Sequence, residues 1–300
     1  MDKDKTPVLG FVGLGVMGGP MCRNMAQKHP GTVIAHDVYP AAFENLEGTG
    51  ARWAASLPEL AEQSDIVFLS LPGGPQVEAV CLGENGLLSG AHKPDVVVDL
   101  STTTRQAACT VARALAEVGV GFADAPVART REAARRGELS IMVGASPALF
   151  NRLEPLLRYI GTDLTHCGDV GCGQVVKLAN NALVFENTLA LAEMMVVAER
   201  AGVDPALLLE GVSKGSGDSF ALRNHGPKSL LPREFPEKAF PPEYAVKDLS
   251  YVLELAEQVG VSARVAKLAQ SYYDATARNG WSGRYFPSVI EVIDRDIPLE

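Results

Sequence analysis

A lysine and an asparagine stand four residues apart in an otherwise apolar stretch, at Lys177 and Asn181. On a helix, this spacing places both side chains on one face. A lysine that is neutral part of the time can remove the hydroxyl proton of an alcohol that loses hydride, and apolar surroundings favour the neutral form. We expect Lys177 to transfer this proton and Asn181 to bind substrate, with Gly173 one turn earlier leaving room for a ligand. The alternative is a lysine that extends to solvent beside a polar helix start.

A glycine-rich turn follows a short apolar run and opens a helical pattern. Gly13 permits a tight turn, Gly15 lets a pyrophosphate approach the backbone, and Gly18 lets the helix pack close to a sheet. The alternative is a glycine-rich turn that binds no nucleotide. The residues predicted to bind the dinucleotide here are Gly13, Leu14, Gly15, Val16, Met17 and Gly18.

An acid, Asp37, ends the second apolar run. Its carboxylate is expected to accept hydrogen bonds from the adenosine ribose and to repel a 2′-phosphate. No Arg or Lys follows it at once, so NAD is favoured as cofactor. NADP stays an alternative, because the sequence does not place Arg52.

Two further loops follow apolar runs, at residues 71–74 and 101–103. Proline and glycine allow a backbone wall close to a cofactor, and hydroxyl groups can bond the nicotinamide carboxamide or ribose. Ordinary turns are the alternative for both loops. The residues expected to contact the cofactor are Leu71, Pro72, Ser101 and Thr102.

Alternating apolar runs and helical patterns in the first half must position these groups. Strands separated by helices predict a parallel-rich, doubly wound sheet whose ligands lie beyond the carboxyl ends of the strands. We predict an α/β Rossmann domain over residues 1–167 and an all-α domain for substrate binding and oligomerisation over 168–300. The expected strands cover 8–12, 33–36, 65–70, 96–99, 121–124 and 140–143. The expected helices include 17–27, 173–201, 205–213, 219–230, 243–260, 262–279 and 285–293.

Composition limits the function classes. With 300 residues, 47% of them hydrophobic, and a formal net charge of −9, the chain has material for a packed core but no basic excess for nucleic acid or a membrane surface. A small anionic substrate is not excluded. The five cysteines lack a C-x-x-C pair, and His166, Cys167 and Cys172 have no further ligands nearby, so we expect reduced thiols, a cytoplasmic protein and no metal. We expect no signal segment, and no uninterrupted apolar stretch that is long enough to span a bilayer.

Six ordered motifs between Val8 and Ile293 together resemble the β-hydroxyacid dehydrogenase family, which includes 3-hydroxyisobutyrate dehydrogenase and tartronate semialdehyde reductase. They are Gly13-Leu-Gly-Val-Met-Gly18, Asp99-Leu-Ser-Thr102, Asp124-Ala-Pro-Val127, Gly137-Glu-Leu139 with Met142-Val-Gly144, Gly171-x-Gly-x-x-x-Lys177-x-x-Asn-Asn181, and Lys247-Asp248.

The resemblance implies a Rossmann domain, a helical second domain like that of 6-phosphogluconate dehydrogenase, and a homodimer or homotetramer built on the long helix. It implies that Lys177 is catalytic and that Asn181 and Asp248 contact substrate. It also places Thr102 on the nicotinamide side and Lys247 in the same cleft, near the cofactor and substrate.

One motif departs from the family. The family usually has Ser-Gly-Gly after Asp-Ala-Pro-Val and cradles the substrate carboxylate there, whereas this chain has Ala128, Arg129 and Thr130. A backbone conformation that depends on glycine would be strained by the last two. We expect all three to line the substrate site, with the Arg129 guanidinium binding an anionic group, and a solvent-exposed arginine is the alternative.

The sequence therefore predicts an NAD-dependent oxidoreductase acting on a small 3-hydroxy acid or its semialdehyde. One alternative is an enzyme similar to imine reductases, which share the fold and cofactor but usually lack the lysine. Another is a dinucleotide-binding module without catalysis, for which loss of Lys177 would be the sign.

Overall fold

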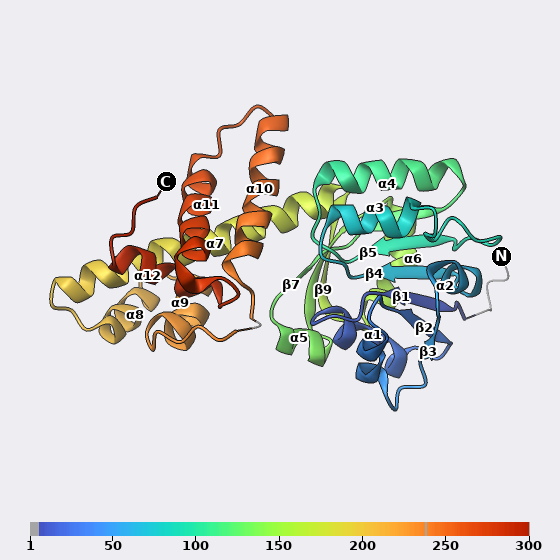
Figure 1. The fold of residues 1–300 in the computed structure, drawn as a ribbon, viewed down its shortest axis with the longest axis horizontal. Coiled ribbons are helices and arrows are strands. Elements are labelled where there is room, and N and C mark those ends of the chain that lie inside the picture. Colours follow the sequence, from blue (N-terminus) through green and yellow to red (C-terminus); the bar gives the residue numbers. More distant parts are fainter. Residues whose placement is uncertain (1–5, 238, 300) are drawn as a thin grey trace. The chain divides into compact units, whose positions relative to one another are not determined.

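The computed structural model describes residues 6–237 and 239–299, and the chain forms two compact units (Figure 1). The first unit runs to Lys177 and the second begins at Leu178, so the division falls inside one long helix. The boundary between residues 167 and 168 stays a prediction.

A nine-stranded sheet forms the centre of the first unit, in the order β3-β2-β1-β4-β5-β6-β8-β7, with β9 paired to β8. Strands β1 to β6 pair in parallel, while β8 runs antiparallel to β6 and β7. The predicted parallel-rich sheet is confirmed. Its strands are β1 Leu9–Val12, β2 Val33–His36, β3 Arg52–Trp53, β4 Ile66–Leu69, β5 Val96–Asp99, β6 Gly121–Asp124, β7 Val127–Ala128, β8 Leu139–Gly144 and β9 Gly161–Gly168.

Helices cover both faces of this sheet. Buried side chains of α2, α3 and α4 pack on one face, and those of α1 and α6 on the other. The helical segments of this unit are α1 Gly18–Lys28, η1 Pro40–Leu46, α2 Leu57–Gln63, α3 Gly74–Leu82, α4 Arg105–Glu117, α5 Arg131–Arg136 and α6 Pro147–Leu157.

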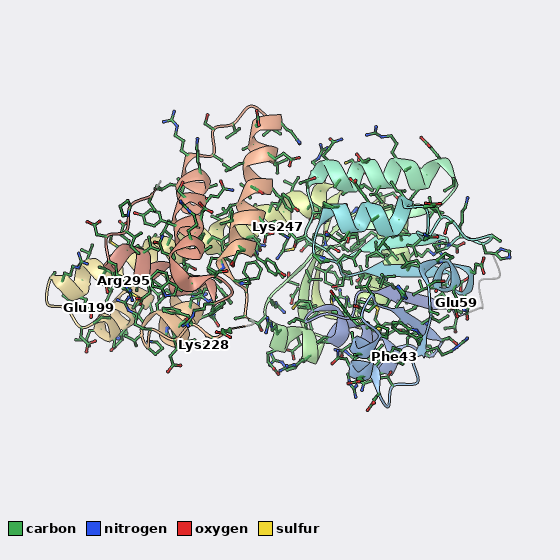
Figure 2. The ribbon with its side chains drawn as sticks, viewed as in Figure 1. Phe43, Glu59, Glu199, Lys228, Lys247 and Arg295 are labelled. Carbon is green, nitrogen blue, oxygen red and sulfur yellow. The ribbon has the colours of Figure 1, made fainter. Side chains whose placement is uncertain are left out.

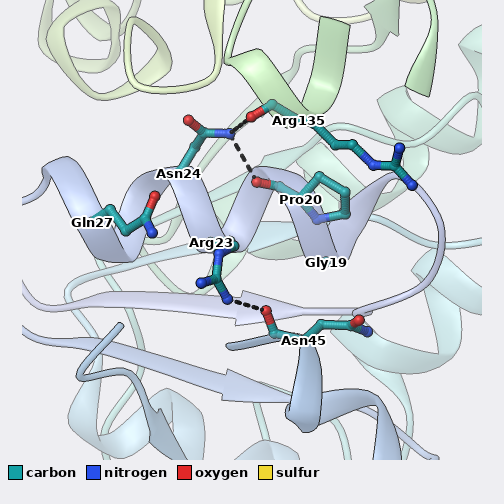
Figure 3. A pocket seen from close by; sticks show the side chains of 7 residues that line it. All are labelled: Gly19, Pro20, Arg23, Asn24, Gln27, Asn45 and Arg135. Carbon is teal, nitrogen blue, oxygen red and sulfur yellow. Dashed lines mark hydrogen bonds between the residues drawn. The ribbon is translucent and has the colours of Figure 1, made fainter. Parts of the chain in front are cut away.

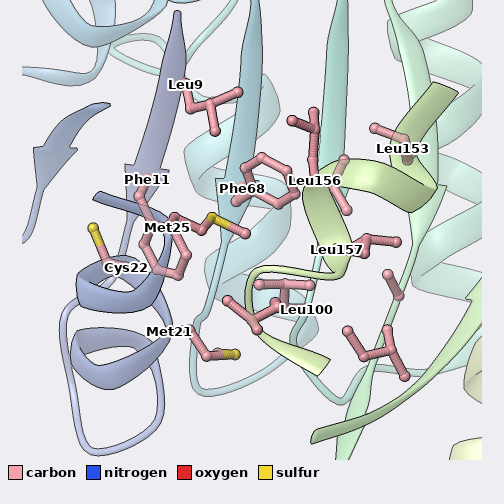
Figure 4. Close-up of a cluster of buried hydrophobic side chains, with 14 of the residues drawn as sticks. Leu9, Phe11, Met21, Cys22, Met25, Phe68, Leu100, Leu153, Leu156 and Leu157 are labelled. Atoms are coloured by element: carbon pink, nitrogen blue, oxygen red, sulfur yellow. The ribbon is translucent and has the colours of Figure 1, made fainter. Parts of the chain in front are cut away.

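The central strands send alternate side chains to opposite faces. Leu9 and Phe11 of β1 join one core with Phe68 of β4 (Figure 4), while Val12 and Leu69 enter the other core. Continuous apolar runs are typical of parallel strands that are covered on both faces. Polar groups are therefore confined to the strand ends and the loops that follow them.

The sequence did not predict strands β3, β7 and β9, for physical reasons. The first two have two residues each, which is too short for a periodic pattern. Strand β9 is longer, but of its eight residues only Gly161 is buried, so it carries no apolar alternation.

Helix α7, Cys172–Arg200, leads from the first unit into the second, and helices form the second unit. Phe185 of α7 lies edge-on to Tyr273 and Phe286, with ring centroids 5.7 and 5.3 Å away, and the Tyr273 hydroxyl donates to the Phe185 carbonyl oxygen at 2.9 Å. These three aromatic side chains are part of the hydrophobic core of the second unit. The remaining segments are α8 Pro205–Ser213, α9 Phe220–His225, η2 Gly226–Leu230, α10 Pro242–Gln258, α11 Arg264–Thr276, η3 Ala277–Trp281, η4 Phe286–Ser288 and α12 Val289–Asp294.

By length and composition alone, α7 is apolar enough to cross a membrane, with a mean hydropathy of 1.3 over an 18-residue window. Half of that window is buried inside the protein. The apolar run is also interrupted near its start by Lys177, Asn180 and Asn181.

Candidate active site

The glycine-rich turn after β1 has the geometry that a pyrophosphate needs. Gly13 has a φ of +94°, and a Cβ there would lie 2.2 Å from the carbonyl oxygen of Ser70. A Cβ at Gly18 would lie 1.9 Å from the carbonyl oxygen of Gly13, so only glycine lets α1 start this close to the turn. A Cβ at Gly15 would meet nothing within 4 Å. The first turn of α1 has no acidic residue and no side-chain cap, which suits its N–H groups to phosphate oxygens.

Asp37 is fixed beside this turn. Its Oδ2 accepts a hydrogen bond from the Leu14 N–H at 2.6 Å, and its Oδ1 accepts one from the Tyr39 N–H at 2.8 Å. The carboxylate thereby holds the end of β2 against the turn. Arg52, which the sequence could not place, donates to Gln63 Oε1 at 2.9 Å. That contact directs its guanidinium to α2.

Ser101 braces the loops that follow β4 and β5. Its hydroxyl accepts a hydrogen bond from the Leu71 N–H at 2.9 Å, and its own N–H donates to Asp99 Oδ1 at 2.9 Å. Ser101 is buried, Thr102 is half-buried and Pro72 is exposed. The structure thus gives Ser101 a bracing role and keeps Thr102 and Pro72 at the surface of the loops, where cofactor contacts are predicted.

Two buried carboxylates, Asp99 and Asp124, end neighbouring strands in register. Burial raises the pKa of Asp99 to about 7, against hydrogen bonds from Ser101 that lower it. Burial also raises the pKa of Asp124 to about 6, against backbone hydrogen bonds that begin with the one from Gly171. The polar edge of the sheet therefore holds two acids that titrate near neutrality.

Asp124 holds the start of α7. Its Oδ1 accepts from the Gly171 N–H at 2.6 Å and its Oδ2 from the Gln174 N–H at 2.8 Å. A Cβ at Gly173 would lie 2.4 Å from the Met142 carbonyl oxygen and 2.8 Å from Asp124 Oδ2. The expectation that Gly173 leaves room for a ligand is therefore wrong, because Met142 and Asp124 fill that space.

The structure places Lys177 and Asn181 one turn apart on α7, each with 8% of its surface exposed. Asn180 donates through Nδ2 to Asn181 Oδ1 at 3.1 Å. Two nearly buried polar side chains at this spacing match the predicted helix face. Their catalytic and substrate-binding roles stay predictions.

In the second unit, Asn181, Asp248 and Lys247 form a polar cluster. Asn181 Nδ2 donates to Asp248 Oδ2 at 2.7 Å, and Lys247 Nζ lies 3.2 Å from Asp248 Oδ1. Lys247, labelled on α10 in Figure 2, also lies over the rings of Tyr251 and Tyr244, 5.3 and 5.8 Å from their centroids. Asp248 is 2% exposed, so it orients an amide and an ammonium group from a buried position.

Arg129 has partners inside the first unit. Its Nη1 donates to the Glu138 carbonyl oxygen at 2.6 Å and to Thr162 Oγ1 at 3.1 Å, and its Nη2 lies 2.7 Å from Asp163 Oδ2. The prediction that this guanidinium binds a substrate anion stays a prediction, and it now requires the guanidinium to exchange these partners.

The backbone at the altered motif is strained at one position only. Arg129 has a φ of +87°, a region that favours glycine. Thr130 has a φ of −91° and caps α5 by accepting a hydrogen bond from the Ala133 N–H. The expected strain is therefore present at Arg129 and absent at Thr130. Ala128 is buried in β7 opposite Ser140 of β8.

A surface pocket of about 370 Å³ lies beside α1 (Figure 3). Arg23 donates to the Asn45 carbonyl oxygen at 2.8 Å, and Asn24 donates to the Arg135 carbonyl oxygen at 3.0 Å. None of the predicted site residues lines it, so it is separate from the candidate site. Its lining residues are Gly19, Pro20, Arg23, Asn24, Gln27, Asn45 and Arg135.

Both halves of the chain match known families. Residues 8–168 match the NAD binding domain of 6-phosphogluconate dehydrogenase. Residues 171–293 match the family described as NAD-binding of NADP-dependent 3-hydroxyisobutyrate dehydrogenase.

Individual relatives extend this likeness over nearly the whole chain. It is 34% identical to 2-(hydroxymethyl)glutarate dehydrogenase of Eubacterium barkeri, covering 96% of this chain and 95% of that one. It is 33% identical to 2-hydroxy-3-oxopropionate reductase of Escherichia coli K12, covering 95% and 97% of the two chains. A solved Mycobacterium tuberculosis 3-hydroxyisobutyrate dehydrogenase with L-serine superposes with a TM-score of 0.87 at 26% identity, covering 96% and 99%. The chain belongs to the β-hydroxyacid dehydrogenase family of NAD(P)-dependent oxidoreductases.

Proposed function

We propose that the protein transfers hydride between NAD and a small 3-hydroxy acid or its semialdehyde, with Lys177 as the general acid and base. One observation carries the proposal: a lysine only 8% exposed stands on α7, whose first turn is bonded to Asp124 at the carboxyl end of β6. A buried lysine on a helix that starts at the ligand-binding edge of such a sheet supports proton transfer rather than a surface role.

The chain's own groups would divide the work as follows. The N–H groups at the start of α1 and the open backbone at Gly15 would hold the pyrophosphate, and Asp37 would accept hydrogen bonds from the adenosine ribose. Nicotinamide, when bound, supplies or accepts the hydride. Lys177 would take the hydroxyl proton during oxidation and return a proton to the carbonyl oxygen during reduction. Asn181 would hydrogen-bond a substrate oxygen through its side-chain amide.

We propose NAD rather than NADP as the preferred cofactor. The Asp37 carboxylate is held beside the turn by Leu14 and Tyr39, so it would meet a 2′-phosphate with a like charge. Arg52 is hydrogen-bonded to Gln63, so the proposal assigns it no contact with a 2′-phosphate, and the negative charge of Asp37 decides the preference.

We propose a small substrate that carries an anionic group. The relatives named for 2-(hydroxymethyl)glutarate, 2-hydroxy-3-oxopropionate and 3-hydroxyisobutyrate supply three candidates. Ala128 brings no hydroxyl group to the altered motif, so Asn181 and Lys247 in the second unit are the polar groups proposed to bind that anion.

We propose a cytoplasmic homodimer or homotetramer. The support for an oligomer is an exposed apolar stripe on α7. It consists of Leu183, Met194 and Val197, with 57%, 47% and 54% of their surfaces exposed. Spacings of eleven and three residues keep the three on one side of the helix. If a second copy covers this stripe, Leu183→Glu should dissociate the oligomer, which light scattering would measure as a lower molecular mass. A parent protein that is itself monomeric would contradict the proposal.

The substrate proposal is tested by NADH oxidation over a panel of aldehyde acids, with cyclic imines as the comparison class. We expect reduction of at least one 3-oxo acid or semialdehyde and none of the imines. Imine reduction without turnover of any aldehyde acid would overturn the proposed function.

A further inference from the structure

Gln174 is a fully buried side chain in the first turn of α7, with none of its surface exposed. Its Oε1 accepts a hydrogen bond from the Thr103 N–H at 3.0 Å, and its Nε2 donates to the Ser101 carbonyl oxygen at 2.8 Å. One amide group thus closes a bridge between α7 and the loop that follows β5. The two hydrogen bonds span 71 and 73 residues of sequence, so no local pattern indicates this bridge.

The same residue is fixed from its backbone side. The Gln174 N–H donates to Asp124 Oδ2 at 2.8 Å, and Asp124 also receives the Gly171 N–H at 2.6 Å. The first turn of α7 is therefore tied to the ends of β5 and β6 at once. Every one of these partners belongs to the first unit.

The loop held by Gln174 is itself part of the predicted cofactor site. Ser101 accepts from the Leu71 N–H, so the loops after β4 and β5 are joined to each other. Thr102 lies between the two residues that Gln174 holds. The bridge consequently fixes the backbone on either side of the residue predicted to face nicotinamide.

We propose that Gln174 is a positioning residue that sets Lys177 relative to the nicotinamide-side loop at Ser101–Thr103. The inference rests on the proposed function, since it assigns Lys177 to proton transfer. Lys177 follows Gln174 by three residues on the same rigid helix, so a shift of the first turn moves the ammonium group with it. An amide suits this position because it both accepts from Thr103 and donates to Ser101.

The first test needs neither cofactor nor substrate. Gln174→Met keeps much of the volume and removes both side-chain hydrogen bonds. In the cofactor-free protein we expect hydrogen exchange at the Thr103 amide to accelerate by about tenfold or more. Thr188→Val is the matched control, since the buried Thr188 side chain donates a hydrogen bond within α7, to the Val184 carbonyl oxygen, and not to the loop after β5. Unchanged protection of Thr103 in Gln174→Met would overturn the bridge.

The second test separates positioning from folding. With an accepted substrate, Gln174→Met should lower kcat by roughly tenfold to hundredfold, because a misplacement near 1 Å has effects of that size. The Kd for NADH should change by less than about threefold, and the primary deuterium isotope effect should rise. Gln174→Glu keeps an acceptor for Thr103 and should recover part of the protection and of kcat. Thr188→Val should lower Tm about as much as Gln174→Met does, but it should leave kcat unchanged.

The outcomes distinguish the two proposals. A parent protein that reduces no aldehyde acid contradicts the proposed function, whatever the exchange data give. A parent that is active, together with a Gln174→Met variant whose kcat stays within about twofold of it, contradicts the positioning role alone.

Discussion

Arg129 Nη2 lies 2.7 Å from Asp163 Oδ2, while the Arg129 backbone has a φ of +87°. Hydrogen bonds from Thr162 and then from Arg129 lower the pKa of Asp163. The side chain that strains the backbone of the altered motif is thus the one that ties it to β9. The pairing favours an anchoring role over binding of a substrate anion.

Two substitutions at Arg129 separate backbone strain from side-chain contacts. Arg129→Met and Arg129→Gly both remove the bonds to Asp163, but only glycine relieves the positive φ. We expect Arg129→Gly to be more stable than Arg129→Met by about 1–2 kcal/mol in denaturant unfolding. If the guanidinium stays with Asp163 during turnover, kcat/KM of Arg129→Met stays within about threefold of the parent. A loss of tenfold or more, with unchanged Kd for NADH, would instead support the prediction that it binds the substrate anion.

The cofactor preference should depend on the charge of Asp37. Asp37→Asn keeps an oxygen acceptor for the Leu14 N–H and removes the negative charge. We expect the ratio of kcat/KM for NADPH to that for NADH to rise by roughly tenfold or more, since like-charge repulsion is relieved. Comparing initial rates with both cofactors measures this. An unchanged ratio, or a parent that already prefers NADPH, would speak against the role of Asp37.

Asp248 should act through the residues it orients. Asp248→Asn leaves the Lys247 ammonium facing an amide and weakens the hold on Asn181. We expect KM for the acidic substrate to rise by about tenfold, with a smaller change in kcat and none in the Kd for NADH. Asp274→Asn, which removes a half-exposed carboxylate of α11 that is paired with Arg278 of η3, is the control. Equal effects in both variants would contradict a site role for Asp248.

Buried Asp99 should make stability depend on pH. Burial raises the pKa of Asp99 to about 7, whereas an unfolded aspartate titrates near pH 4. Unfolding therefore releases a proton between about pH 4 and 7, and the Asp99 contribution to stability falls as pH rises through that window.

Asp99→Asn removes this titration. We expect it to match the parent near pH 4 and to exceed the parent in free energy of unfolding at pH 8, on the order of 2–4 kcal/mol. Asp95→Asn, on a half-exposed carboxylate just before β5, reports the general effect of losing one charge. A constant difference between parent and Asp99→Asn across this range would show that Asp99 does not titrate there.

The sequence was most informative at glycines, because a missing Cβ atom has one direct physical consequence, the close approach of another group. The roles of Gly13 and Gly18 in the turn follow from their missing Cβ atoms, and the structure bears out both close approaches. Gly173 shows the limit of this reasoning, since its missing Cβ makes room for Met142 and Asp124 rather than for a ligand.

Partners that are distant in sequence could not be predicted. Asp163 lies 34 residues from Arg129, on the unpredicted strand β9, and Asp124 lies 50 residues from Gln174. The first pairing depends on which strands are neighbours in the sheet, and the second depends on where α7 starts relative to β6. A single sequence specifies neither. The tight turn at Gly13 and Gly18 was therefore predictable, while the contacts that hold Arg129 and Gln174 in place were not.

The proposed function depends on Lys177 transferring the proton that accompanies hydride transfer. Lys177→Met removes the amine and keeps an unbranched side chain in a site that is only 8% exposed in the parent. The most direct measurement is the single-turnover rate of NADH oxidation by this variant, with a substrate that the parent reduces. We expect a loss of roughly 10²–10⁴ in that rate, with the Kd for NADH unchanged and the fold intact by circular dichroism. A single-turnover rate close to that of the parent would contradict it.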